Sequence, residues 1–168
     1  MPTQANVAAY TLPRNYLNGR VSAARVELLD LQTVSIFSQG AFDALISAYR
    51  GSGGTARAED LALLLAEKGQ GSFSSLARGI VKGEIFSIEW NSHFWLPMFQ
   101  FEAHDMSMKH SVRKIMSELA HVLDNWSLAT WFAEPNVWLR NCRPVDMLDS
   151  NLPEVFAAAR AERFVAAG

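Results

Sequence analysis

The sequence predicts a mainly α protein: a compact helical chain with a helix-turn-helix-like pair, one β-hairpin and a C-terminal bundle of short helices. Three observations predict this class. Apolar residues between His110 and Leu123 recur every three or four positions, as in an amphipathic helix. Residues 84–90 alternate in the period of a strand. The stretch Asn125–Leu148 is rich in tryptophan and is cut into short pieces by two prolines.

Composition limits the classes of function. The chain has 168 residues, 49% of them apolar, and a net charge of −2, which argues against a surface built throughout for nucleic acid. The single cysteine, Cys142, excludes an intramolecular disulfide and fits a reducing compartment. No apolar run is long enough to cross a bilayer, and no signal peptide is evident, so we expect a cytoplasmic protein without a membrane partner.

The N-terminal region is expected to hold an arm and two helical pieces. Residues 1–20 mix proline, asparagine and glycine without a period and are interpreted as an N-terminal arm. From Val21 to Ala48 the apolar spacing predicts two helical pieces, broken near Ser38–Gly40. Gly51–Gly54 is predicted to be a linker; no Gly-Lys-Ser/Thr ending follows it, which argues against a phosphate-binding loop.

Two short helices around a glycine turn follow the linker. Thr55 is a plausible N-cap for a helix over Arg57–Lys68, and a second helix is expected over Ser72–Lys82. This outline is that of a helix-turn-helix, whose second helix would contact DNA. The candidate contacts are Ser74, Ser75, Arg78 and Lys82. Because so few of them are basic, an αα-hairpin that only packs remains the alternative.

A β-hairpin is predicted next, with strands Glu84–Trp90 and Phe94–Phe101. Pro97 is expected to confine the second strand to an edge or a bulge. A hairpin after a helix-turn-helix has the outline of a winged DNA-binding module. Because an isolated hairpin is barely stable, its aromatic side chains are expected to pack on the flanking helices, so the two halves should share a core.

The C-terminal third, residues 110–168, is expected to form the bundle, with residues 21–109 as the N-terminal region. In it we predict a helix ending near Ala133, a short helix over Pro135–Leu139, a turn at Arg140–Cys142, a helix from Pro144 and a closing helix over Pro153–Val165. Three tryptophans are expected to anchor its core, namely Trp126, Trp131 and Trp138. Arg160 and Arg163 are placed on the side of the closing helix away from Val155, Phe156 and Ala159.

From Val112 to the C-terminus the chain resembles the toxin-binding domain of Xre/MbcA/ParS-like antitoxins. The residues that carry the resemblance are Trp131, Pro135, Asn136, Leu139, Pro144 and Leu148, followed by the amphipathic closing helix. The phrase Pro97-Met98-Phe99-Gln100-Phe101 is similar to one that precedes this domain in some relatives. Two positions depart from the family: Asn141 stands where a glycine is usual, and Arg143 where a threonine or serine is usual.

The resemblance implies an antitoxin of a type II toxin-antitoxin system that neutralises a RES-type toxin, an enzyme acting on NAD, by blocking its pocket. It also implies that the end of the closing helix touches the toxin, which makes Arg160, Arg163, Phe164 and Gly168 the candidate toxin-binding residues. Together with the aromatic residues Trp90, Phe94 and Trp95 on the hairpin, it suggests a homodimer. The alternative is a DNA-binding regulator that binds operator DNA and whose C-terminal domain only dimerises.

No catalytic chemistry is expected. The four histidines and Cys142 have no metal-ligand spacing, and we assign no catalytic residue, metal or cofactor. The chain is therefore interpreted as a binding protein and not an enzyme.

Overall fold

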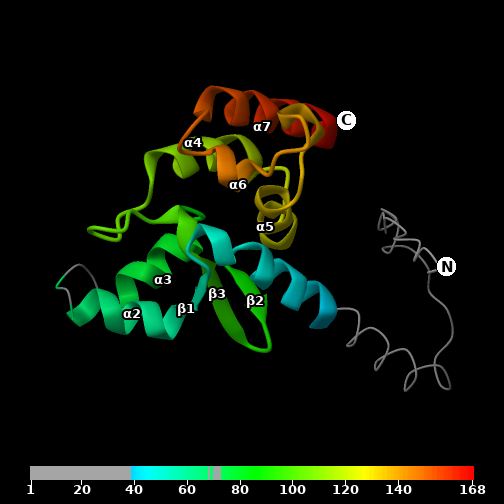
Figure 1. Cartoon of the computed structure of the whole chain (residues 1–168). Coiled ribbons are helices and arrows are strands. Elements are labelled where there is room, and N and C mark those ends of the chain that lie inside the picture. Colours follow the sequence, from blue (N-terminus) through cyan, green and yellow to red (C-terminus); the bar gives the residue numbers. More distant parts are fainter. Residues whose placement is uncertain (1–38, 68, 70–72) are drawn as a thin grey trace, which may run out of the picture. The chain divides into compact units, whose positions relative to one another are not determined.

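The computed structural model describes residues 39–67, 69 and 73–168 (Figure 1). The expected arm, residues 1–20, and the chain up to Ser38 lie outside them. Residues 39–48 form a helix, so the break expected near Ser38–Gly40 is wrong at Gln39 and Gly40. One glycine costs a helix only about 1 kcal/mol, and burial of apolar side chains such as Phe42 and Leu45 outweighs it.

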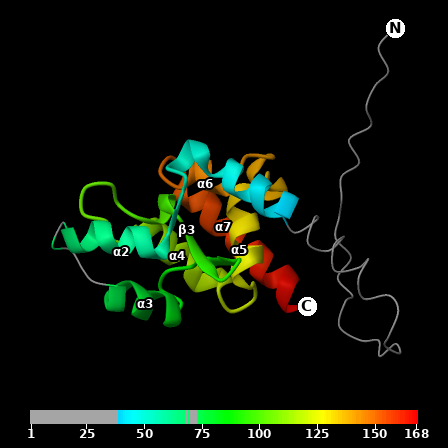
Figure 2. The same ribbon diagram turned by 90° about the horizontal axis from the view of Figure 1, so that it is seen from below.

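A three-stranded antiparallel sheet, in the order β1-β3-β2, organises the N-terminal half of the described chain. After η1 (Arg50–Ser52) the order is β1 (Thr55–Arg57), α2 (Ala58–Glu67), α3 (Phe73–Val81), β2 (Ile88–Trp90), β3 (His93–Pro97) and η2 (Met98–Gln100). Helices α2 and α3 lie together beside the sheet (Figures 1 and 2). The mainly α class with a small antiparallel sheet is confirmed.

Strand β1 was not predicted. Thr55 does not cap a helix; it pairs with Pro97, and Arg57 pairs with Trp95. A three-residue strand is too short to show alternation, and only its distant partner β3 reveals it.

Pro97 lies on the central strand of the sheet, so the edge expected for that strand is wrong. Proline is still found where its missing N–H would face no strand partner. Strand β2 pairs with β3 only between His93 and Trp95, so at Pro97 one side of the strand has no neighbour in the sheet. The missing N–H of the proline therefore breaks no ladder hydrogen bond.

The hairpin strands are shorter than predicted because the buried side chain of Gln100 replaces part of the ladder. Its amide donates to the carbonyls of Phe86 and Pro97, each at 3.0 Å, and its oxygen accepts from the Phe86 N–H at 3.3 Å. Phe86 thus satisfies its backbone through a side chain and needs no strand partner. The segment before Ile88 is irregular in consequence.

The C-terminal half follows the predicted succession closely. It contains α4 (His110–Leu119), α5 (Asn125–Ala133), η3 (Val137–Leu139), α6 (Pro144–Met147) and α7 (Leu152–Ala167). Asp124 caps α5 by accepting from the Ser127 N–H at 2.7 Å, and Asn136 caps η3 through the Trp138 N–H at 2.9 Å. Pro144 opens α6 in the first turn, as its fixed φ favours. Helix α7 packs along α4 (Figure 1).

One hydrophobic core crosses the expected boundary near residue 109. It joins Phe42, Phe86 and Phe99 of the N-terminal half to Ile115 and Phe132 of the C-terminal half. Aromatic rings build the contact: Phe86 stacks on Phe132 with 5.7 Å between ring centroids, and Phe99 lies 5.0 Å from Phe132. A smaller cluster fills the space between α2, α3 and β3, around Leu61, Leu76 and Leu96.

The tryptophan cluster is only partly the core anchor that was expected. Trp131 is buried at 8% exposure and packs edge-on against Phe132. Trp126 is half-buried and lies against Trp90. Trp138 is 58% exposed, which contradicts its predicted place in the core. The apolar face of η3 is instead supplied by Leu139, which is fully buried.

Candidate functional site

The helix pair and the hairpin have the arrangement of a winged helix-turn-helix. A helix, a strand, two helices and a hairpin follow in order, and the first strand pairs with the last. At the hairpin tip, Asn91 and Ser92 have φ of 49° and 62°, as a two-residue turn with a left-handed backbone requires. The four candidate DNA contacts are exposed on or just after α3: Ser74, Ser75, Arg78 and Lys82.

The charge around α3 is modest for a DNA-binding surface. Arg78 donates from Nε to the backbone oxygen of Ser74 at 3.2 Å, so its side chain lies along its own helix. Glu84 and Glu89 are exposed nearby in sequence, after α3 and on β2. A phosphate backbone needs several cations, and α3 with its following residue offers Arg78 and Lys82.

The hairpin aromatic residues are mostly covered within the chain. Trp90 stacks on Phe42 with 4.9 Å between centroids, and Trp95 packs edge-on against the same ring. Arg57 lies over the Trp95 ring at 5.1 Å. Phe94, 42% exposed, lines an apolar hollow of about 130 Å³ together with Ile80 and Val81. Trp90 and Trp95 are therefore largely unavailable to a second copy of the chain, and the homodimer stays a prediction.

The candidate toxin-binding residues of α7 differ in their contacts within the chain. Arg163 forms an ion pair with Glu118 of α4, and Phe156 lies under Lys114 of the same helix at 4.6 Å. Arg163 therefore shares the side of Phe156, and its expected place on the opposite side is wrong. Arg160 is exposed, as are Gly168 and Phe164, the last with 81% exposure.

A hollow that the sequence did not predict lies between η3 and α7. Its volume is about 250 Å³, and it is lined by Trp131, Glu134, Pro135, Asn136, Val137, Trp138 and Glu162. Val137 is 76% exposed at its rim. The sequence offered one sign of this hollow, the N-cap residue Asn136. When the cap fixes the short turn and Leu139 faces the core, its neighbour Trp138 must face outward.

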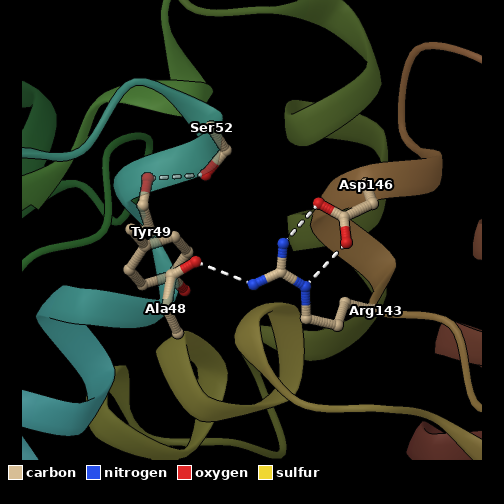
Figure 3. Close-up of polar contacts among 5 residues, drawn as sticks. All are labelled: Ala48, Tyr49, Ser52, Arg143 and Asp146. Carbon is tan, nitrogen blue, oxygen red and sulfur yellow. Dashed lines mark hydrogen bonds and ion pairs between the residues drawn. The ribbon is translucent and has the colours of Figure 1, made fainter.

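Arg143 joins the two halves of the chain (Figure 3). Its guanidinium binds both carboxylate oxygens of Asp146, at 2.6 and 2.7 Å, and donates to the carbonyl of Ala48 at 2.8 Å. It therefore satisfies a carbonyl at the end of the helix over residues 39–48. The hydrogen bond to Asp146 raises the pKa of the Arg143 guanidinium above its usual value. Arg143 therefore gives α6 no side-chain cap, and instead forms an ion pair inside α6 and a hydrogen bond to the N-terminal half.

Beside this junction, Tyr49 is fully buried and its hydroxyl donates to the carbonyl of Ala129 at 2.5 Å. Burial raises the pKa of Tyr49 well above its ordinary value, and the positive charge of Arg143 opposes that rise. A polar hollow of about 350 Å³ adjoins the junction, with Ser52, Lys109, Asp146 and Asp149 in its lining. Lys109 and Asp149 are paired across it at 2.8 Å.

No catalytic or metal-binding constellation is found among the described residues. His93 pairs with Glu59 at 3.3 Å and His104 with Asp105 at 3.2 Å, all at exposed or half-exposed positions. Cys142 is exposed in the turn after η3. Within the described ranges, no three acidic, histidine or cysteine residues gather as metal ligands do. None of the helices described is both long and apolar enough to cross a membrane.

Comparisons of the chain with protein-family models, curated proteins and solved structures found no match.

Proposed function

We propose that this chain is an antitoxin-like protein that binds and neutralises a RES-type toxin through its C-terminal helices. The observation that carries the proposal is a set of exposed apolar side chains on η3 and the end of α7: Val137, Trp138, Phe164 and Val165, between 52% and 81% exposed. Large apolar side chains gathered at the surface of a well-packed half are typical of protein interfaces.

The residues that carry the family resemblance support the proposal by their positions. Trp131, Leu139 and Leu148 are buried in the core, Asn136 caps η3 and Pro144 opens α6. These residues hold η3 in a conformation that presents Val137 and Trp138. They are structural, so they account for the shape of the surface and not for its chemistry.

The end of α7 is suited to enter a cleft. Arg163 fixes the helix to α4 through Glu118, while Arg160 and Phe164 are exposed. The residues after Val165 are Ala166, Ala167 and Gly168, which add little bulk. A free arginine beside a slender tail can bind a carboxylate or a phosphate group in the toxin's nucleotide pocket.

Co-expression with a RES-type toxin tests the proposal. We expect the toxin to co-purify and to be neutralised, and we expect deletion of Phe164–Gly168 to weaken neutralisation while the fold remains. Arg160→Gln should weaken it too, whereas Arg140→Gln, which removes an exposed arginine paired with Glu154, is the matched control. Full neutralisation by the truncated chain would exclude the tail, and failure to bind any such toxin would reject the proposal.

DNA binding is the second candidate function, and the sheet order β1-β3-β2 around α2 and α3 favours it. If α3 contacts operator DNA, Arg78→Gln with Lys82→Gln should weaken binding to all sequences. The slope of log K against log salt concentration should become shallower by about two. The control is Arg50→Gln with Arg113→Gln, which removes two exposed cations away from α3. Absence of binding to the operator region at low salt would leave α2 and α3 as a packing hairpin.

A further inference from the structure

The acidic residues of the C-terminal half fall into two groups. Five have a polar partner within the chain: Glu118 with Arg163, Asp146 with Arg143, Asp149 with Lys109, Glu154 with Arg140, and Asp124 with the N–H of Ser127. In the part of the chain that the structure describes, the carboxylates of Glu134 and Glu162 have no ion pair and accept no hydrogen bond.

Both unpaired carboxylates line the same hollow, although they come from different elements. Glu134 ends α5, and Glu162 lies on α7 one turn after Ala158, which is buried. Two like charges beside one concave surface raise its affinity for a cation. The neighbouring arginine, Arg163, does not neutralise them because it is paired with Glu118.

Aromatic side chains complete the lining. Trp138 exposes 58% of its surface, so its ring is accessible from the hollow. Trp131, 8% exposed, lines the same hollow, and its indole N–H finds no acceptor among the described residues. The hollow therefore combines negative charge with an accessible indole ring.

The chemistry selects a guanidinium as the ligand. Among the described residues no three or more metal-ligating side chains gather at one place, and two carboxylates would repel a phosphate. A guanidinium can lie flat on an indole ring and bind carboxylates with two parallel hydrogen bonds, which an ammonium cannot do. The exposed apolar rim formed by Val137 suits a protein more than a small molecule.

We propose that this hollow receives an arginine side chain of a protein partner, with its guanidinium on the Trp138 ring and paired with Glu134 and Glu162. The inference deepens the proposed function, since the partner would be the toxin, and it adds a contact separate from the α7 tail.

A titration with N-acetyl-arginine-methylamide tests the hollow without the partner. The ¹⁵N-labelled full chain should show saturable shifts of the Trp138 indole resonance, with a Kd in about the millimolar range. The citrulline analogue, which has the same shape without the charge, should give none. Glu134→Gln with Glu162→Gln should weaken arginine binding about tenfold or more. Equal shifts by citrulline, or no saturable shift by arginine, would overturn the proposal.

The same double variant tests the contact in the complex. We expect it to weaken binding of the co-purified toxin about tenfold or more, and Trp138→Leu to weaken it as well. Glu67→Gln with Glu84→Gln removes the same charge from exposed positions of the N-terminal half and should leave binding unchanged. If the toxin binds the Glu134/Glu162 variant as tightly as the original chain, the arginine contact is wrong while the proposed function stands. If no toxin binds, the proposed function fails, and the titration with N-acetyl-arginine-methylamide still shows whether the hollow binds a guanidinium.

Discussion

At the scale of single residues, Trp131 of α5 and Trp138 of η3 have opposite roles. Trp131 packs in the core at 8% exposure, whereas Trp138 is 58% exposed. Trp131→Ala should lower the free energy of unfolding by about 3–5 kcal/mol, because it removes a large buried ring and leaves a cavity. Trp138→Ala should change it by about 0.5 kcal/mol or less. Urea unfolding followed by circular dichroism measures both; equal losses would contradict the assignment of roles.

Tyr49 should make stability fall at high pH. Burial raises the pKa of its hydroxyl in the folded chain, while the unfolded chain titrates near its ordinary pKa of about 10. Above that pH the unfolded state loses the proton and the folded state keeps it, so the contribution of Tyr49 to stability is complete below about pH 10 and declines above it.

Tyr49→Phe supplies the comparison for this pH effect. The variant should be less stable near neutral pH by about 1–3 kcal/mol, because the Ala129 carbonyl loses its buried donor. Its stability should fall less steeply than that of the original chain between pH 10 and 11, by up to about 1.4 kcal/mol. Parallel pH profiles of the two proteins would show that Tyr49 does not govern the decline.

At the scale of elements, Arg143 links α6 to the helix over residues 39–48. Arg143→Met should lower the free energy of unfolding by about 1–3 kcal/mol, since it removes charge-assisted bonds to Asp146 and the Ala48 carbonyl. Arg140→Met breaks an ion pair in which the arginine is 80% exposed, and should cost about 1 kcal/mol or less. Chemical denaturation compares them, and an equal cost would mean that the Ala48 bond adds nothing.

The sequence predicted elements well where local signals define them. Prolines, caps and helical periodicity lie within the elements themselves, so the succession from α4 to α7 could be read directly. Strand β1, the central place of β3 and the irregular segment held by Gln100 depend on partners far along the chain. Local patterns carry no information on such pairings.

The candidate site was predicted less well than the fold, for a related reason. The dense cluster of tryptophans placed Trp138 in the core, because aromatic residues are usually buried. The hollow that it lines requires three elements to meet, and the unpaired state of Glu134 and Glu162 follows only when the partners of the other carboxylates are known. Arg163 was misplaced because the helical spacing was misread: it follows Phe156 by seven residues and therefore lies on the same face of α7, where it pairs with Glu118 of α4.

At the scale of the whole molecule, the shared core decides whether the C-terminal half can fold alone. Phe86, Phe99 and Tyr49 come from the N-terminal half, yet they pack against Phe132 or bind the Ala129 carbonyl of α5. A fragment of residues 110–168 would expose the faces of α4 and α5 that these aromatic rings cover. About sixty residues without that cover bury too little surface to be stable.

We therefore expect the fragment 110–168 to be unfolded at 25 °C, with poorly dispersed amide resonances, while the full chain has a dispersed spectrum. The full chain should lose its helical circular dichroism and its tryptophan fluorescence in one coincident transition, because the same core supports both halves. Two separate transitions, or a folded fragment, would show that the C-terminal helices form an autonomous module. If the chain unfolds cooperatively, a partner bound at η3 and α7 also stabilises the N-terminal half, because binding to the folded state stabilises everything that unfolds with it.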